Sequence, residues 1–385
     1  MVQETAVMDI GSSKITVLVG RRGVNNTICI VGTGESEYAG YEDGEWFQPD
    51  ELINAVARAV SRAQTDSHVK IRHLYIGVPG QFTATQCKEV SMSLGRRRKV
   101  TDDDVDELYE LGDTFDGDPN YKLINTQPIY FTLEDDRKLI QPVGMTASRL
   151  SGYISYILAE RRFIQTFDRI MNELGIDSHE YVSSVLAESL FLFDDFVRDR
   201  YAVLIDVGYI VTDVVVARGD GILRQFSIPI GGGHITKDLR DDLDIRFSLA
   251  EKLKRKAVLN LEFGEDDTYE VSIKDRKKSF SARAVNDIVT VKINKIARTV
   301  NNCLMSCDLP SSTTYWLTGG GISYITGARD YLSKRMDRRI DIAAPRLPQY
   351  NTPHLSSVLG LLDMVLDDEE EPTAKKGFFA RLFGR

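Results

Sequence analysis

Two segments far apart in the chain carry the same pattern, and this internal repeat constrains the fold more than any other feature. Each copy is an apolar β run that ends in Asp-x-Gly, turns, and returns as a second run of β-branched residues; the copies occupy residues 9–19 and 206–216. The pattern predicts a β-hairpin with an acidic residue at its tip and a glycine that lets the backbone approach a ligand closely. Two such hairpins could hold a polyphosphate between backbone N–H groups, with Asp9 and Asp206 positioned for a metal ion. The repeat therefore predicts a two-lobed protein that clamps a nucleotide.

Length and composition narrow the class of protein. At 385 residues the chain is long for a single core, so two lobes are expected. The net charge of −9, from 48 basic and 57 acidic residues, argues against a nucleic-acid partner. Cys303 and Cys307 lie one helical turn apart without a His or Cys partner pair, which favours core packing over metal binding. The first β run begins without a signal peptide, and no apolar stretch reaches about 18 residues, so we expect a cytoplasmic chain without a membrane span.

Apolar spacing predicts where helices and strands form. Helical spacing occurs at residues 49–63, 161–174, 186–197, 249–259, 284–304 and 355–366, and short strands are expected at 74–78 and 315–317. The stretch 81–155 is more polar and is interpreted as an insertion. Within it, the basic run at residues 96–99 is interpreted as a solvated turn ahead of a capped helix that begins near Thr101.

Two glycine turns follow the second hairpin, at residues 231–233 and 319–321. Glycine leaves bare backbone against which a flat ring or a ribose can pack. Two aspartate hairpins followed by Leu-Thr-Gly-Gly-Gly, in this order and spacing, resemble the actin-like ATPase superfamily. Within it the chain resembles the FtsA family of bacterial division proteins over nearly its full length. The supporting segments are residues 8–14, Pro-Val-Gly-Met at 142–145, Ala-Glu-Lys-Leu-Lys at 250–254, and the amphipathic terminus.

The resemblance implies an α/β, actin-like two-lobed fold. It comprises a duplicated ribonuclease-H-like core, an inserted subdomain in the first lobe and a C-terminal amphipathic helix. The expected first-lobe core (1A) covers 1–80 and 159–198, with the inserted subdomain (1C) at 81–158. The expected second-lobe core covers 199–246 (2A) and, with the return helix, 313–366, with a smaller subdomain (2B) at 247–312. An acidic linker is expected at 367–374, and the amphipathic helix at 375–385.

The resemblance also implies a site for ATP and Mg²⁺. The first phosphate loop would comprise Gly11, Ser12, Ser13 and Lys14, and the second Gly208 and Thr212. Asp9 and Asp206 would lie near the magnesium ion. The adenosine side would be lined by Gly232, Gly233, Glu251, Lys254, Gly319, Gly320 and Gly321. The alternative for Glu251 and Lys254 is a surface pair at i,i+3, which contributes only a few tenths of a kcal/mol.

Two departures from the superfamily pattern favour nucleotide binding over hydrolysis. Relatives usually continue the second loop as Asp-x-Gly-Gly-Gly-Thr, whereas Tyr209 and Ile210 replace two of those glycines here. Relatives also carry a Glu before a Pro that orients the attacking water, and the best match here is Ser-Val at 184–185. Glu188, one turn further on, could substitute; the alternative is a satisfied glutamate on a helix surface. With Asp9 and Asp206 it completes the catalytic candidates, and we expect a weak or slow ATPase at most.

The carboxy-terminal segment predicts membrane binding. Its apolar side chains fall within about 140° on a helical wheel. These are Phe378, Phe379, Leu382 and Phe383, and the accompanying cations are Lys375, Lys376, Arg381 and Arg385. Roughly ten residues do not hold a helix alone in water, but an interface that buries the aromatic face stabilises one. Each cation adds on the order of 1 kcal/mol at an anionic leaflet, so an array binds well. The alternatives are a helix docked on the core, or disorder.

A third surface is assigned through the resemblance. In the FtsA family the smaller subdomain of the second lobe captures the C-terminal peptide of FtsZ, and a basic surface suits a peptide with acidic residues. The candidates are Arg283, Lys292, Lys295 and Arg298, for which a solvated helix face is an equally compatible interpretation.

Together these features predict an ATP-binding protein that forms filaments with copies of itself at the division septum. It would lie on the inner leaflet of the cytoplasmic membrane, tether FtsZ and help recruit downstream divisome proteins. Two rivals share the fold. One is a PilM-like pilus-assembly adaptor, against which the terminal helix and the Pro-Val-Gly-Met segment count. The other is a small-molecule kinase, which fold alone does not exclude.

Overall fold

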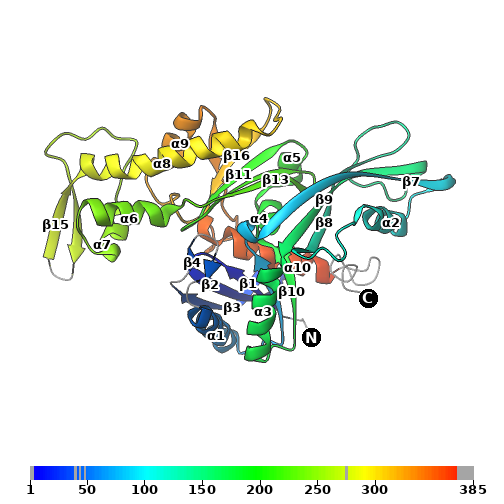
Figure 1. Ribbon diagram of the computed structural model, residues 1–385, viewed down its shortest axis with the longest axis horizontal. Coiled ribbons are helices and arrows are strands. Elements are labelled where there is room, and N and C mark those ends of the chain that lie inside the picture. The colour runs from blue at the N-terminus through cyan, green and yellow to red at the C-terminus, as the bar shows by residue number, and fades with distance from the viewer. Residues whose placement is uncertain (1–3, 39–40, 43–44, 47–48, 274–275, 371–385) are drawn as a thin grey trace. The chain divides into compact units, whose positions relative to one another are not determined.

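The computed structural model describes residues 4–38, 41–42, 45–46, 49–273 and 276–370 (Figure 1). These divide into two compact units. Unit 1 comprises Met1–Tyr201, Val215–Gln225 and Ser357–Arg385, and unit 2 comprises Ala202–Val214 and Phe226–Ser356. The finer subdomain boundaries expected from the sequence stay predictions.

The first five-stranded sheet has the order β3-β2-β1-β6-β10. Its strands are β1 (Thr5–Ile10), β2 (Lys14–Arg22), β3 (Ile28–Glu37), β6 (His73–Val78) and β10 (Ser178–Ser183). The first three form an antiparallel meander, and β6 runs parallel to both β1 and β10. Four of the six positions of β1 are buried apolar residues, as expected for a strand in the middle of a covered sheet.

The second five-stranded sheet repeats this order as β13-β12-β11-β16-β17. Its strands are β11 (Ala202–Val207), β12 (Thr212–Arg218), β13 (Gly221–Ile228), β16 (Thr314–Thr318) and β17 (Ile340–Ile342). As in the first sheet, the central parallel strand β16 pairs with the first strand of the meander and with the last strand. The duplication seen in the sequence is therefore a duplication of topology.

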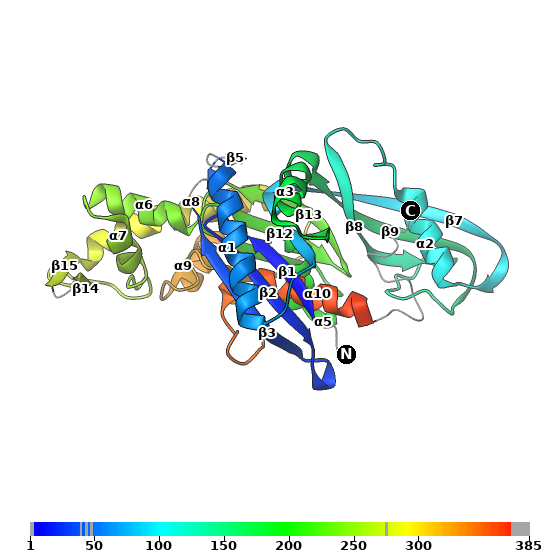
Figure 2. The same ribbon diagram turned by 90° about the horizontal axis from the view of Figure 1, so that it is seen from below.

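Helices cover the first sheet within unit 1. Helix α1 (Pro49–Ser67) packs on β3 and β2 (Figure 2). Its buried residues are Leu52, Ala55, Val56, Ala59, Val60 and Ala63. Gly34 of β3 allows a very close approach, since a Cβ there would lie 1.9 Å from the carbonyl oxygen of Ala59. The other α-helices that the structure describes in this unit are α2 (Asp102–Gly112), α3 (Arg161–Leu174), α4 (Ser184–Leu192), α5 (Asp195–Arg198) and α10 (Ser356–Glu370).

Helix α3 matches the predicted span and ends at Gly175, whose left-handed φ of 65° makes it a C-cap residue. The prediction of a single helix over residues 186–197 is wrong, because the structure has two helices there, α4 and α5. The chain leaves α4 at the buried Phe193, and the side chain of Asp194 then caps α5 by accepting a hydrogen bond from the Val197 N–H. A capping side chain thus starts a new helix where apolar spacing alone continued the old one.

The insertion forms a three-stranded antiparallel sheet, β7-β9-β8, with α2 (Asp102–Gly112) packed on β7 and β9. Its strands are β7 (Thr83–Lys99), β8 (Tyr121–Thr132) and β9 (Thr146–Glu160).

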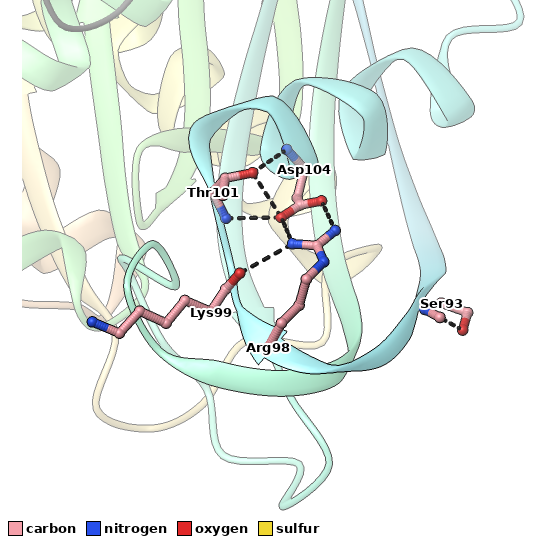
Figure 3. Close-up of polar contacts among 6 residues, drawn as sticks. Ser93, Arg98, Lys99, Thr101 and Asp104 are labelled. Atoms are coloured by element: carbon pink, nitrogen blue, oxygen red, sulfur yellow. Dashed lines mark hydrogen bonds and ion pairs between the residues drawn. The ribbon is translucent and has the colours of Figure 1, made fainter.

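The basic run at residues 96–99 belongs to β7, so its interpretation as a turn is wrong. Arg98 makes two 2.6 Å contacts with the buried Asp104, which with Thr101 forms the capping box of α2 (Figure 3). Arg98 holds the pKa of Asp104 well below its usual range.

The described part of unit 2 also contains four α-helices and a small hairpin. The helices are α6 (Gly232–Asp242), α7 (Phe247–Lys254), α8 (Ala282–Met305) and α9 (Ala328–Met336), and the hairpin is β14 (Thr268–Ile273) with β15 (Arg276–Ser281). Helix α8, yellow in Figure 1, packs on α6 and α9. Its buried stripe is the predicted one: Val285, Val289, Ile293, Ile296 and Val300. No described helix is long and apolar enough to span a bilayer.

Candidate functional site

The first Asp-x-Gly hairpin is a tight turn between β1 and β2. Strand pairing continues to Ile10 and Ile15, and the Gly11 N–H donates to the Lys14 carbonyl oxygen at 3.0 Å. This turn holds Ser12 and Ser13 half-exposed at the tip. The ammonium of Lys14 lies 2.5 Å from the Glu35 carboxylate in a partly exposed pair. Such a pair contributes at most about 1 kcal/mol, so Lys14 can exchange Glu35 for a phosphate at little cost.

Asp9, at the end of β1, is held by a residue from the far end of the chain. The Ser357 hydroxyl donates to Asp9 Oδ1 at 2.7 Å. Burial raises the pKa of Asp9, while the hydrogen bond from Ser357 and the charge of Lys14 oppose that rise. Because burial penalises the charged carboxylate, a cation bound beside it would be favoured. The chemistry of Asp9 therefore fits a magnesium ligand.

Glu188 lies on α4, directly after the strand that neighbours β6. It is only 2 % exposed, so its interpretation as a glutamate on a helix surface is wrong. Helix α10 packs closely against this part of α4: a Cβ on Gly360 would lie 2.6 Å from the Ala187 carbonyl oxygen and 2.9 Å from the Glu188 Cα.

The second hairpin repeats the turn and meets two glycine segments. The Gly208 N–H donates to the Val211 carbonyl oxygen at 2.9 Å, as in the first hairpin. Backbone bonds then connect the three segments: the Gly321 N–H donates to the Val207 oxygen at 2.7 Å and the Gly232 N–H to the Gly208 oxygen at 2.9 Å. The three glycine-containing turns predicted from the sequence thus converge within unit 2.

Only glycine fits at the centre of this convergence. A Cβ on Gly232 would lie 2.2 Å from the Gly321 oxygen, and a Cβ on Gly321 would lie 2.3 Å from the Gly208 oxygen. Gly319 has a φ of 86°, and a Cβ there would lie 2.0 Å from Asp206 Oδ1. The Asp206 carboxylate therefore lies directly against the Gly319 backbone, and Gly320 follows with a half-exposed surface near Tyr324 and His354.

The carbonyl groups of the second loop are partly committed. The Gly233 N–H donates to the Tyr209 oxygen at 2.6 Å, in addition to the Gly232 bond. Thr212 is fully buried and donates to the Ile230 oxygen at 2.6 Å, which makes it a structural tie between β12 and the segment before α6. The second loop therefore offers less free polar surface than the first.

Glu251 and Lys254 form an ion pair in which Lys254 is buried and Glu251 is partly exposed, so the alternative of a surface pair is wrong for Lys254. Their charged groups lie 2.8 Å apart, the Lys254 side chain is 4 % exposed, and its ammonium also donates to the Gly232 oxygen at 3.1 Å. Thr236 of α6 donates to the Glu251 carboxylate at 2.6 Å. Burial raises the pKa of Glu251, but the charge and hydrogen bond of Lys254, with Thr236 and Arg255, outweigh it and lower the pKa. The pair fixes α7 to the glycine turn.

Three residues near the loops were not predicted. Ser357 contacts Asp9 from 348 positions away, and no sequence signal pointed to that contact. Tyr38 donates from its hydroxyl to the Gly11 oxygen at 2.9 Å. Asp213 is buried next to Thr212, and burial raises its pKa to about 6 against a hydrogen bond from Ser227. The sequence shows Asp213 as a second acid inside an apolar hairpin, but nothing in its spacing assigns it to the site.

Among the described residues, no group of three or more His, Cys, Asp or Glu side chains forms a metal cluster. A magnesium ion bound with a nucleotide needs only one or two carboxylates, because phosphates and water complete its shell. Asp9 and Asp206 are suitable as single ligands of this kind.

The predicted peptide surface is mostly exposed. Arg283, Lys295 and Arg298 are exposed on α8, with Val291, 61 % exposed, on the same side of the helix. Lys292 instead faces α6, where its ammonium lies 3.2 Å from the Asp238 carboxylate.

The predicted membrane segment lies outside the described residues. Its residues are Lys375, Lys376, Phe378, Phe379, Arg381, Leu382, Phe383 and Arg385.

Two sheets of the same order, each opening with an Asp-x-Gly hairpin, define an actin-like fold. Solved structures agree. PilM in the PilM–PilN type IV pilus biogenesis complex superposes with a TM-score of 0.63 at 13% identity, covering 95% of this chain and 99% of that one. MreB5 of Spiroplasma citri bound to AMPPNP gives 0.56 at 12% identity, covering 96% and 99%. At these identities the likeness concerns the fold alone, which is the predicted one.

Sequence comparisons identify the family. The family model for cell division protein FtsA matches residues 203–360, and the model for the SHS2 domain inserted in FtsA matches residues 80–158. FtsA of Neisseria meningitidis serogroup B is 25% identical over 368 residues, covering 93% of this chain and 89% of the relative. FtsA of Bacillus subtilis is 21% identical over 376 residues, covering 96% and 85%. The chain belongs to the FtsA family of cell-division proteins, as the sequence resemblance predicted.

Proposed function

We propose that this protein binds ATP with Mg²⁺ through its two Asp-x-Gly loops. In this proposal it forms filaments on the cytoplasmic face of the cell membrane at the septum, anchors FtsZ filaments there and helps recruit downstream divisome proteins. The observation that carries the proposal is the repeated turn. Gly11 and Gly208 make the same backbone bond in two sheets of the same order, in a chain of the FtsA family.

The two loops would have different tasks. Ser12, Ser13 and Lys14 offer hydroxyl groups and a cation to phosphate oxygens, because they lie half-exposed at the first tip. Asp9 and Asp206 would hold Mg²⁺, which neutralises phosphate charge when bound. The glycine turn at residues 319–321, supported through Gly232 by the pair of Glu251 and Lys254, would present bare backbone to the adenosine.

ATP would act as a conformational ligand, with slow hydrolysis at most. Support comes from the second loop, where Tyr209 and Ile210 stand in place of glycines and the Gly232 and Gly233 amides are committed to loop carbonyls. Glu188 is the candidate water-orienting residue. Rapid turnover by the purified protein without FtsZ, lost in Glu188→Ala, would contradict this part of the proposal.

The FtsZ peptide would dock on the exposed face of α8. Arg283, Lys295 and Arg298 lie on the same side of α8 as the exposed Val291, and the exposed Asp287 lies between Arg283 and Val291. Three basic residues against one acidic residue, near an apolar side chain, suit a short peptide that carries both apolar and acidic residues. Lys292 is a weaker candidate, since Asp238 already neutralises it.

Liposome co-pelleting tests the anchoring role. FtsZ is mixed with vesicles containing anionic lipid and either the full chain or a chain that ends at Glu371. We expect only the full chain to carry FtsZ to the lipid, because the shorter chain lacks the aromatic and basic terminal segment. Equal pelleting with both chains would contradict membrane anchoring by this segment. The triple change Arg283→Glu, Lys295→Glu and Arg298→Glu should leave the protein on the vesicles but release FtsZ.

A further inference from the structure

Helix α10 brings a hydroxyl group onto the acidic tip of the first hairpin. The Ser357 hydroxyl, in the first turn of α10, donates to Asp9 Oδ1 at 2.7 Å. The two residues are 348 positions apart, so the contact exists only because α10 returns to the first sheet.

Close packing fixes the position of α10 against that sheet. A Cβ on Gly77 of β6 would lie 2.4 Å from Leu361 Cδ1, and a Cβ on Gly20 of β2 would lie 2.6 Å from Leu362 Cδ2. Both leucines are fully buried. Glycines on two strands therefore let the helix approach more closely than any other residue would allow, and Gly360 does the same toward α4.

The other end of α10 is held by Arg22, whose side chain is only 7 % exposed. Its guanidinium donates to Asp363 Oδ1 at 2.8 Å and to the Asp363 carbonyl oxygen at 2.9 Å, and it also contacts the Asp367 carboxylate. With leucine packing in the middle and Arg22 at the far end, the rotation of α10 is set. The Ser357 hydroxyl is thereby delivered to one place.

We propose that Ser357 is a positioning residue that orients the Asp9 carboxyl for the magnesium ion of a bound nucleotide. The final torsion of an aspartate is broad, so its carboxyl group turns freely unless a partner fixes it. A donor on Oδ1 fixes that turn and leaves Oδ2 with acceptor capacity for the metal. The inference rests on the proposed nucleotide binding at these loops and adds a residue that the family resemblance did not supply.

The test is calorimetric titration of the purified full-length protein with ATP, in excess Mg²⁺ and separately in EDTA. Ser357→Ala should weaken binding about tenfold in Mg²⁺, since a hydrogen bond to a charged group is lost, and should leave binding in EDTA unchanged. Ser357→Thr keeps the hydroxyl and should bind as the wild type does. Ser356→Ala is the matched control, because the neighbouring hydroxyl bonds to Thr318 and Pro353 rather than to Asp9.

The outcomes separate the inference from the function on which it rests. Wild-type protein that binds Mg²⁺-ATP, together with Ser357→Ala that binds equally well, would overturn the inference alone. Equal weakening in Mg²⁺ and in EDTA would also overturn it, because the hydroxyl would then support the loop rather than the metal. Wild-type protein that binds no ATP would overturn the proposed function, and the inference with it.

Discussion

The two Asp-x-Gly hairpins share a backbone and differ in almost everything that the backbone carries. Gly11 and Gly208 make the same turn, with N–H to carbonyl distances of 3.0 and 2.9 Å to Lys14 and Val211. The first tip holds two serines and a lysine, half-exposed. The second holds a tyrosine, an isoleucine and a valine, and two glycine segments bond to it. One copy carries polar side chains at its tip, and the other serves as a backbone platform for two glycine segments.

The acidic residues show the same contrast. Asp9 accepts a hydrogen bond from a serine hydroxyl, whereas Asp206 lies against the backbone of Gly319. When Asp9 is aligned with Asp206, Thr16 in the return strand of the first copy corresponds to Asp213 in that of the second. The turn geometry of both copies depends on one glycine. The side chains around that glycine can therefore differ between the copies without changing the turn.

The largest expected effect breaks the platform of the second copy. In Gly232→Ala the new Cβ would lie 2.2 Å from the Gly321 oxygen, a backbone atom that cannot move alone. We expect a loss of about 3 kcal/mol or more in the free energy of unfolding, measured by chemical denaturation. Gly11→Ala, at the turn of the first copy, is the comparison: the nearest atom to its Cβ is 3.1 Å away, and it should cost less than about 1 kcal/mol. Equal losses would contradict the contrast.

Asp213→Asn should stabilise the protein at neutral pH. Burial raises the pKa of Asp213 to about 6, above its unfolded value, so the folded state binds the proton more tightly. Stability therefore falls as pH rises from about 4 to about 6, by up to about 3 kcal/mol. Asparagine removes this penalty and can still accept the Ser227 hydrogen bond. Unfolding measured at pH 4 and pH 7.5 should show a gain for the variant only at the higher pH, whereas a gain at both would refute the assignment.

Thr212→Val should remove a buried tie that the first copy lacks. The hydroxyl bond to the Ile230 oxygen at 2.6 Å disappears, and valine keeps the shape of the side chain. We expect a loss of about 1–2 kcal/mol, because a buried carbonyl loses a donor. The first-copy counterpart, Ile15→Val, removes one buried methylene group and should cost about 1 kcal/mol through packing alone. A neutral Thr212→Val would mean that the hydroxyl bond contributes nothing.

The smallest expected change in stability comes from the first tip. Lys14→Ala removes a partly exposed pair with Glu35 and should alter the free energy of unfolding by less than about 0.5 kcal/mol. Its affinity for Mg²⁺-ATP should nevertheless fall, because the cation is available to a phosphate. Glu35→Ala is the control: it removes the same pair but should keep or increase the affinity. A large loss of stability in Lys14→Ala would make the lysine structural.

Local features of the fold could be predicted from the sequence. The hairpin turns, the end of α3 at Gly175 and the buried stripe of α8 follow from short-range spacing and glycine chemistry. The convergence of the glycine turns followed from the family resemblance. The break between α4 and α5 at Asp194 was not predicted, because the apolar pattern continues through the residue that caps α5. Sequence spacing does not show burial, so for Glu188 and for the pair of Glu251 and Lys254 it left a surface interpretation open beside the functional one.

The contact between Ser357 and Asp9 could not be predicted, because it depends on how a helix from one end of the chain packs on a strand from the other. The same holds for Lys292. Helical spacing correctly placed it outside the buried stripe, but only the packing of α6 on α8 brings Asp238 within reach of its ammonium.

The central claim is that both hairpins serve one nucleotide, and calorimetry tests it most directly. Titration of the wild-type protein with ATP and Mg²⁺ should show one site per chain. Asp9→Asn and Asp206→Asn should each weaken that binding strongly while the thermal unfolding transition is kept. Absence of binding heat in the wild type, or full affinity after either change, would contradict the account.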